Sequence, residues 1–249
     1  MTSEVLVHLD HVDVERGGRT VLHDVCLELE PGLVALLGPN GSGKSTLLQA
    51  LATILPISFG RIDVCGEDIG RWRAADRARR RLGYLAQEPA ALDHLSVVEA
   101  CTYSAWLRLV PRTKRDHAVA SVIDALSLGD VSKRRLSDLS GGTRRRAHLA
   151  LALVHDPQVL LMDEPTSGLD PDHRAEVRDL FAQLAQHRLV LFSTHLSEDL
   201  VAATRRVVYL ADGRVHFDGT PDELGALGRA AESVRNTDID SGLRSLGLT

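Results

Sequence analysis

The sequence LVALLGPNGSGKS, residues 33–45, decides the fold. Its first five residues form a continuous apolar run, which is typical of a strand buried on both faces of a parallel sheet. The following residues fit the pattern G-x-x-x-x-G-K-[ST] and lead into a predicted helix from about Lys44 to Leu55. A glycine-rich turn in this position binds phosphate, because its backbone N–H groups and the helix dipole point at one anion.

We therefore expect this loop to bind ATP together with Mg2+. Lys44 would bring a positive charge to the outer phosphates, and the Ser45 hydroxyl would be an oxygen ligand for Mg2+. The residues expected to contact ATP here are Gly38, Pro39, Asn40, Gly41, Ser42, Gly43, Lys44, Ser45 and Thr46.

Two adjacent carboxylates follow a second apolar run. VLLM at 159–162 is predicted to be a buried strand, and it ends at Asp163 and Glu164. The C-terminal edge of a parallel sheet is where α/β proteins open their ligand crevice. Asp163 is expected to hold Mg2+ and Glu164 to orient the attacking water, a role worth roughly 10²–10⁴ in rate. The alternative is that both acids only begin a loop, which Pro165 then turns.

Strands and helices alternate on both sides of these motifs. Strands are expected at 5–14, 20–29, 33–37, 61–64, 82–86, 159–162, 188–193, 206–211 and 215–217, and helices at 44–55, 95–125 with a break at Pro111, 143–155, 172–186, 197–203 and from Pro221. This order predicts an α/β fold: a P-loop NTPase core with a mostly parallel sheet, an antiparallel N-terminal β layer and a helical insert at about 88–140. We expect one domain over 4–228 and assign no role to the polar tail 229–249.

Composition argues against several classes of function. A net charge of -5 and 4% aromatic residues do not suit a nucleic-acid-binding protein. Three separated cysteines fit reduced cytosolic thiols better than a disulfide framework or a zinc site. The N-terminus lacks a secretory pattern, and no run approaches the roughly 18 apolar residues of a membrane span. Two basic clusters are interpreted as solvated helix faces: Arg77, Arg79, Arg80 and Arg81, and Arg144, Arg145 and Arg146.

The motif LSGGT at 139–143 stands just before the helix predicted at 143–155. With it the chain resembles the ATP-binding subunits of ABC transporters, whose signature is written LSGGQ. The resemblance covers about residues 5–224. It includes the family's remaining motifs, which here are Gln87 (Q-loop), Ser167-Gly168-Leu169-Asp170 (D-loop) and His195 (H-loop).

The resemblance implies roles for these residues. His195 would contact the γ-phosphate and position Glu164, and Gln87 would touch Mg2+ or water. Ser167 and Asp170 would couple two active sites. Ser140, Gly141 and Gly142 would cap the ATP held by the opposite subunit of a head-to-tail dimer, formed with an identical or a related chain.

The same resemblance implies a membrane partner. The wording of the motifs is similar to that of bacterial ABC-2-type exporter ATPases, which act on a separate transmembrane permease. We therefore expect an ATPase at the inner face of the cell membrane that powers transport, with export as the expected direction. The alternative is a soluble ABC-type ATPase acting on a ribosome, DNA or an assembly complex. A P-loop kinase or GTPase would leave the Ser-Gly-Gly signature and His195 unexplained.

Two positions depart from the family pattern. The fifth signature residue is Thr143 instead of Gln, which leaves the three phosphate-contacting positions intact. The aromatic residue that usually stacks on adenine is replaced by Arg16. A guanidinium plane can also stack on a base, although Arg16 could equally be an ordinary surface residue.

Overall fold

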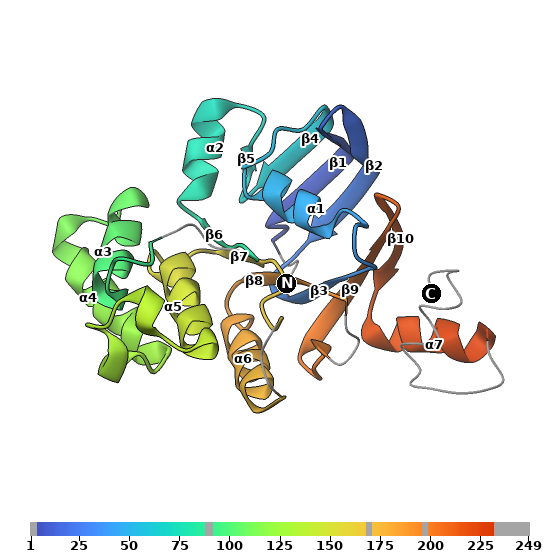
Figure 1. The fold of residues 1–249 in the computed structure, drawn as a ribbon. Helices are drawn as coiled ribbons and strands as arrows, with labels where there is room; N and C mark the ends of the chain where they lie inside the picture. The colour runs from blue at the N-terminus through green and yellow to red at the C-terminus, as the bar shows by residue number, and fades with distance from the viewer. Residues whose placement is uncertain (1–3, 88–91, 168–170, 196–198, 232–249) are drawn as a thin grey trace.

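The computed structural model describes residues 4–87, 92–167, 171–195 and 199–231 (Figure 1). Its strands are β1 (Val7–Arg16), β2 (Arg19–Leu29), β3 (Gly32–Leu37), β4 (Phe59–Val64), β5 (Glu67–Asp68), β6 (Leu82–Leu85), β7 (Val159–Met162), β8 (Leu189–Thr194), β9 (Thr204–Ala211) and β10 (Arg214–Gly219). Its helices are α1 (Lys44–Leu51), α2 (Trp72–Arg79), α3 (Val97–Leu107), α4 (Arg112–Ala125), α5 (Gly141–Leu153), α6 (Pro171–Leu184) and α7 (Pro221–Ala231), with 3-10 turns at Gly129–Val131 and Leu136–Asp138.

Two sheets organise the molecule. The larger has the strand order β10-β9-β3-β8-β7-β6, in which β10 is antiparallel and every other neighbouring pair is parallel. The smaller has the order β2-β1-β4-β5 and is antiparallel throughout. The predicted fold class, a mostly parallel core with an antiparallel N-terminal layer, is confirmed. β3, which delivers the phosphate loop, lies inside the larger sheet between β8 and β9.

Alternate residues of the central strands serve two separate cores. On β3, Val34 and Leu36 pack with α1 and the antiparallel layer. Leu33 and Ala35 point to the other face, where they pack with residues of α3, α5 and α6. This is the period of two that a strand imposes. Burial on both faces explains why the run at 33–37 is apolar without interruption.

The helices α3, α4 and α5 gather at one end of the molecule, beyond β6 and β7 (Figure 1). The helix α3 begins with a capping box: Glu99 N–H donates to the Ser96 hydroxyl, and Ser96 N–H donates to the Glu99 carboxylate at 2.8 Å. The described part of the insert predicted at about 88–140 contains α3, α4 and the two 3-10 turns. The signature helix α5 follows directly.

Several predicted elements need correction. The helix after the phosphate loop ends at Leu51 instead of Leu55, and the signature helix starts at Gly141, so the signature glycines lie in its first turn. The predicted helix 197–203 is wrong over 200–203, which contain no helix, and 196–198 lie outside the described residues. The helix α2 was not among the predicted helices, although the cluster of Arg77, Arg79, Arg80 and Arg81 at its end was interpreted as a solvated helix face. No helix in the described ranges combines the length and apolar character needed to cross a membrane.

Candidate active site

The phosphate loop is shaped by two glycines that have no room for a side chain. Gly43 caps α1 with a φ of 107°, and a Cβ there would lie 2.8 Å from a methyl carbon of Leu22. A Cβ on Gly38 would overlap the carbonyl oxygen of Leu210 on β9. The glycines therefore allow the loop to lie against the neighbouring strands while its backbone curves around the start of α1.

Lys44 is buried inside this curve. Its side chain is the first of α1, the residue is 5% exposed, and its Nζ donates to the carbonyl oxygens of Gly38 at 2.8 Å and Pro39 at 2.9 Å. Burial lowers the pKa of Lys44, and the charges of Glu164 and Asp163 oppose that shift. A buried ammonium group held by the loop itself is a fixed positive charge beside the helix N-terminus.

A cavity of about 460 Å³ opens beside the loop. Its wall is formed by the end of β1, the phosphate loop, and the segments that follow β6 and β7. The residues that line it are Arg16, Val21, Asn40, Gly41, Gly43, Lys44, Ser45, Thr46, Gln87 and Glu164. The structure thus brings together most of the residues expected to bind ATP, including Arg16. Of the others, Ser42 has a buried hydroxyl oxygen with no hydrogen-bond partner among the described residues.

The two acids at the end of β7 have different surroundings. Asp163 is 2% exposed, and one of its carboxylate oxygens accepts a hydrogen bond from the Ser193 hydroxyl at 2.7 Å. The same Ser193 oxygen accepts the backbone N–H of Glu164 at 2.9 Å. Ser193 on β8 therefore fixes the strand end that carries both acids.

The Glu164 carboxylate lies between two other predicted site residues. Gln87 Nε2 donates to one of its oxygens at 3.3 Å, and His195 Nδ1 lies 3.7 Å from the other. Glu164 also has a φ of 44°, which is uncommon for a residue with a side chain. Strained backbone of this kind concentrates at functional sites, where the surrounding structure enforces it. Gln87, Glu164 and His195 thus form one cluster, of which Gln87 and Glu164 line the cavity and His195 does not.

Oxygen-donating side chains around the cavity suit Mg2+. The Ser45 hydroxyl lines the cavity, and the second carboxylate oxygen of Asp163 has no hydrogen bond within the described ranges. The amide oxygen of Gln87 is also available, since its nitrogen is the atom that contacts Glu164. Hydroxyl, carboxylate and amide oxygens are the hard ligands that Mg2+ accepts, with water completing the shell. The donor set therefore fits the ion expected from the sequence.

The signature residues lie elsewhere. Ser140 is the N-cap of α5, its hydroxyl donates to the Thr143 hydroxyl at 2.9 Å, and Gly141 begins the helix. Ser140 and Gly141 are exposed. Among the residues described, none of the three signature positions lines the cavity at Lys44. Of the predicted D-loop pair, Ser167 is exposed, and Asp170 lies outside the described residues.

Three residues that support the site were not predicted. Ser193 is one of them. Asp199 is another: it is 1% exposed and accepts hydrogen bonds from Thr166 at 2.8 Å and Thr194 at 2.5 Å, which ties the loop after β7 to the end of β8. Their polar side chains beside a buried apolar strand were the available signal. The third is Arg145, which was wrongly interpreted as part of a solvated helix face.

Arg145 instead donates hydrogen bonds to backbone carbonyl oxygens beside Gln87 and Glu164, and burial lowers its pKa. Of the other cluster, Arg77 and Arg80 do lie on α2 or at its end, where they pair with Glu67 and Asp76.

Comparison with known proteins agrees with this geometry. The family model described as "ABC transporter" matches residues 22–167, more than half of the chain. The chain is 35% identical over 227 residues to the sulfate/thiosulfate import ATP-binding protein CysA of Yersinia pseudotuberculosis. The match covers 88% of this chain and 61% of CysA, so the chain spans about three-fifths of that relative.

A second relative matches over most of both chains. The phosphonates import ATP-binding protein PhnC of Nitratidesulfovibrio vulgaris is 36% identical, with 83% of each protein covered. The solved structure of cbiO1 from Clostridium perfringens, described as part of the ABC transporter complex cbiONQ, has a TM-score of 0.81 and 26% identity over 92% of this chain and 94% of that one. The chain therefore belongs to the ABC transporter family, among its ATP-binding proteins.

Proposed function

We propose that this protein binds and hydrolyses MgATP in the cavity beside Lys44. Lys44 and the loop N–H groups bind the phosphates, Ser45 and Asp163 hold Mg2+, and Glu164 polarises the attacking water. His195 and Gln87 keep the Glu164 carboxylate in place. The observation that supports this assignment best is the cluster of Gln87, Glu164 and His195, in which Gln87 and Glu164 line the phosphate-loop cavity and His195 lies beside Glu164. Mg2+, when bound, neutralises charge on the phosphates.

The site as proposed is completed by a second subunit. The exposed N-terminus of α5, with the Ser140 hydroxyl and the Gly141 and Gly142 N–H groups, is an anion-binding device without a phosphate loop beside it. In a head-to-tail dimer it would cover the triphosphate held by the partner's Lys44 loop. Ser167 and Asp170 would then connect the two sites. The second subunit is an identical chain or a related ATP-binding protein.

We further propose that a separate transmembrane permease docks on the face between α2 and α3. A groove of about 350 Å³ lies there. It is lined by Ile54 after the end of α1, by Arg79 of α2, by Tyr84 of β6, and by Leu107 and Leu109 at and just beyond the end of α3. Three of these are apolar and more than half exposed: Ile54 at 57%, Leu107 at 53% and Leu109 at 59%. Exposed apolar side chains gathered in a groove are typical of an interaction site.

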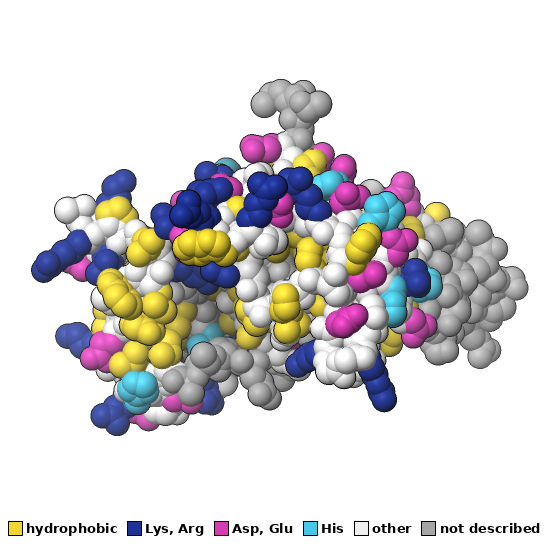
Figure 2. All heavy atoms as spheres, turned by 90° about the horizontal axis from the view of Figure 1, so that it is seen from above, with side chains coloured by type: hydrophobic (Ala, Val, Ile, Leu, Met, Phe, Trp, Pro, Cys, Tyr) yellow, Lys and Arg dark blue, Asp and Glu magenta, His cyan; other side chains and the backbone are white. Residues whose placement is uncertain are grey.

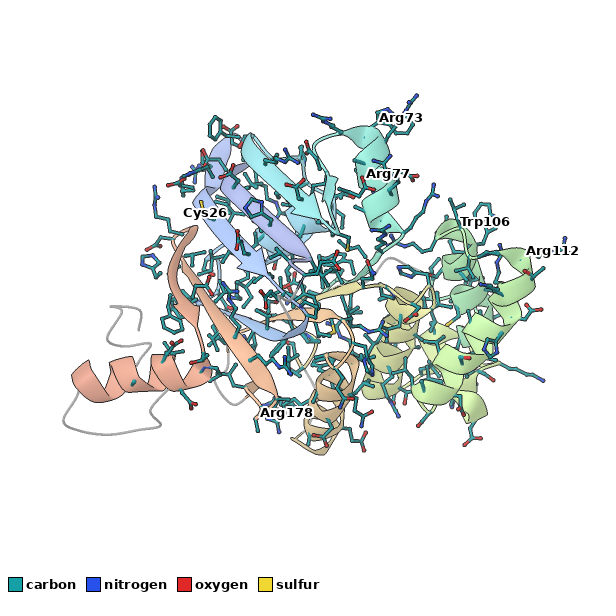
Figure 3. The ribbon with its side chains drawn as sticks, turned by 180° about the vertical axis from the view of Figure 1, so that it is seen from behind. Cys26, Arg73, Arg77, Trp106, Arg112 and Arg178 are labelled. Atoms are coloured by element: carbon teal, nitrogen blue, oxygen red, sulfur yellow. The ribbon has the colours of Figure 1, made fainter. Side chains whose placement is uncertain are left out.

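The surroundings of the groove are basic and aromatic. Figure 2 shows Lys and Arg side chains along one side of this face and hydrophobic ones along the other. Figure 3 shows Arg73 and Arg77 on α2, with Trp106 and Arg112 on α3 and α4. Trp106 is 54% exposed, and Tyr103 stacks beside it with ring centroids 5.9 Å apart. Docking of the permease here would place the protein on the cytoplasmic side of the membrane.

For the direction of transport we rely on the relatives whose names state a direction. CysA and PhnC are both import proteins, so the comparisons give no support to the export expected from the sequence, and we propose import. The reconstituted complex tests this in liposomes with ATP on the side of this subunit. Sulfate and phosphonate are the first probes. Stimulation of ATP hydrolysis by a probe on the opposite side is the expected result, and stimulation only from the ATP side would contradict import.

The catalytic assignment is tested with Glu164→Gln. The amide cannot polarise water as a carboxylate does, so we expect hydrolysis to fall by roughly 10²–10⁴-fold while MgATP affinity stays close to that of the unmodified protein. Phosphate release and fluorescent ATP binding measure the two quantities. Undiminished hydrolysis in this variant would exclude Glu164 as the base.

The docking assignment is tested with Leu107→Glu, matched by Phe59→Glu on β4, where Phe59 is 66% exposed and lies outside the groove. The binding partner in this test is a permease encoded by a neighbouring gene. We expect Leu107→Glu to lose co-purification with it and Phe59→Glu to keep it. ATP binding by each variant reports that it is folded. Co-purification with ribosomes or DNA in place of a membrane protein would instead support the non-transport alternative.

A further inference from the structure

Arg145 uses all of its hydrogen-bond donors on the loops of the active site. Its side chain rises from the first turns of α5, and its Nη2 donates to the carbonyl oxygens of Asp163 at 2.9 Å and Glu164 at 3.1 Å. Its Nη1 donates to Ala86 at 2.9 Å and Gln87 at 3.3 Å, and its Nε donates to Pro165 at 3.3 Å. A guanidinium group has five N–H donors, so five carbonyl oxygens satisfy it completely.

This environment is unusual for a charged group. Burial lowers the pKa of Arg145, and the electrostatic interactions with Asp163, Glu164 and Tyr84 oppose the shift. No carboxylate in the part of the chain that the structure describes pairs with it as an ion pair. Removing a charge from water is costly, and here backbone carbonyl dipoles provide the compensation. Arg145 therefore fixes the relative positions of three segments: the loop after β6, the loop after β7 and the start of α5.

The three segments all belong to the proposed machinery. One carries Gln87, the second carries Glu164, and the third is the helix that begins with the signature residues Ser140 and Gly141. Glu164 needs this support, because its backbone adopts a φ of 44°. Movement of the α5 N-terminus would therefore move the guanidinium group, and with it the carbonyl groups on either side of the Gln87–Glu164 contact.

We propose that Arg145 is a positioning residue for ATP hydrolysis, which transmits the position of the signature helix to the Glu164 carboxylate of the same chain. The inference rests on the catalytic role proposed for Glu164. Arg145 does not line the ATP cavity. We therefore expect Arg145 to affect the rate of hydrolysis, through the geometry of Gln87 and Glu164, and not the affinity for ATP, which depends on Lys44.

The test compares Arg145→Gln with Arg144→Gln. Arg144 is the neighbouring residue on the same helix, and its side chain makes no hydrogen bond within the described ranges. We expect Arg145→Gln to lower kcat by about 10²-fold, the scale of a misplaced catalytic group, with KM and fluorescent ATP affinity changed less than about threefold. Arg144→Gln should keep kcat. Arg145→Lys keeps the charge but has three donors from one atom, so we expect it to restore only part of the rate.

A double-variant cycle separates positioning from general damage. If Arg145 acts through Glu164, Arg145→Gln should reduce the residual rate of Glu164→Gln by less than about threefold, because residues that act as a unit are non-additive. A full additional loss of about 10²-fold would show a role unrelated to Glu164 and overturn the proposal. So would a kcat for Arg145→Gln within about twofold of the unmodified protein, or a loss confined to KM.

Misfolding of the variant and failure of the proposed catalytic role can both be distinguished from failure of this inference. Should Arg145→Gln fail to fold, as judged by circular dichroism, Arg145→Lys carries the same measurements and the same criteria. If the unmodified protein hydrolyses ATP and Glu164→Gln does not, the proposed catalytic role stands whatever Arg145 does. If the unmodified protein shows no hydrolysis, that role and this inference fail together.

Discussion

The phosphate loop and the signature turn both stand at helix N-termini, where backbone N–H groups can bind an anion, yet their surroundings differ within the described residues. The loop before α1 has a buried Lys44 and an adjoining cavity, which Glu164 also lines from the end of β7. The turn before α5 has an exposed Ser140 and Gly141, and none of its signature residues lines that cavity among the residues described. This contrast is the basis for proposing that the first region holds the triphosphate and that the second contacts a triphosphate held by another subunit.

Lys44→Ala should impair the phosphate loop most broadly, because it is expected to reduce both ATP binding and hydrolysis. The substitution deletes a buried charge aimed at the phosphates, so we expect hydrolysis to fall by about 10²–10³-fold and ATP binding to weaken strongly. Phosphate release and fluorescent ATP titration measure both. Lys133→Ala, at an exposed lysine far along the chain, is the control. Binding and hydrolysis near normal in Lys44→Ala would contradict the assignment of the loop.

Acid should destabilise the fold through buried histidines on and just beyond the signature helix α5, whereas α1 contains no histidine. Burial lowers the pKa of His155, just beyond α5, to about 4, while its Nε2 lies 3.1 Å from the Leu82 carbonyl oxygen. The unfolded chain takes up this proton near pH 6.5, so stability is complete above about 6.5 and is lost as the pH falls toward 4. His148 on α5 has its pKa lowered by burial too.

Urea unfolding at about pH 7.5 and about pH 5 measures the effect. His155 alone should account for a loss of about 2 kcal/mol in the free energy of unfolding between these values. His155→Gln, which does not titrate, should show a correspondingly smaller loss, and His117→Gln, at an exposed histidine, should behave like the unmodified protein. Equal losses in all three proteins would contradict a buried neutral His155.

Ser193→Ala should weaken the positioning of Asp163 and Glu164 while leaving the phosphate loop unchanged. Asp163 loses a buried hydrogen-bond donor and the Glu164 N–H loses its acceptor, a change of about 1–3 kcal/mol. We expect kcat to fall by roughly tenfold and ATP affinity to change little. Thr102→Ala, on an exposed hydroxyl of α3, is the control. A normal kcat in Ser193→Ala would show that the acids hold their positions without it.

Arg16→Ala gives the smallest expected effect and tests whether Arg16 contributes to ATP binding. Arg16 lines the cavity at the end of β1. If its guanidinium stacks on adenine at this exposed position, the loss of about 0.5–1 kcal/mol weakens ATP binding by about two- to fivefold. Arg19→Ala, an exposed arginine of β2 outside the cavity lining, is the control. A change of less than twofold in Arg16→Ala would make it an ordinary surface residue.

The sequence was informative where chemistry and chain order coincide. The phosphate loop and the pair Asp163 and Glu164 are contiguous with buried strands, so both their identity and their place in the sheet could be predicted. Arg145 contacts Gln87 from 58 positions away through backbone oxygens, and backbone acceptors leave no trace in a sequence. Ser193 and Asp199 likewise act through contacts made only when β7 and β8 pair.

Helix boundaries failed for a related reason. The helix α2 carries its buried face on three alanines, Ala74, Ala75 and Ala78, among many charged residues. Alanine gives only a weak hydrophobic pattern, so the charged residues of this segment concealed the helical periodicity in the sequence. Conversely, residues 200–203 have a helix-like composition but follow β8 closely and lead at once into β9. Tertiary position overrides local preference in both segments.

The central claim is that a triphosphate held by one chain is covered by the signature of another. Sedimentation velocity of Glu164→Gln with and without MgATP tests it most directly, because the variant binds ATP and does not consume it. We expect a monomer that doubles in mass when MgATP is added, and no doubling when Ser140→Arg is introduced as well. A Glu164→Gln protein that binds MgATP and stays monomeric at every concentration would rule out the proposed head-to-tail dimer of this chain.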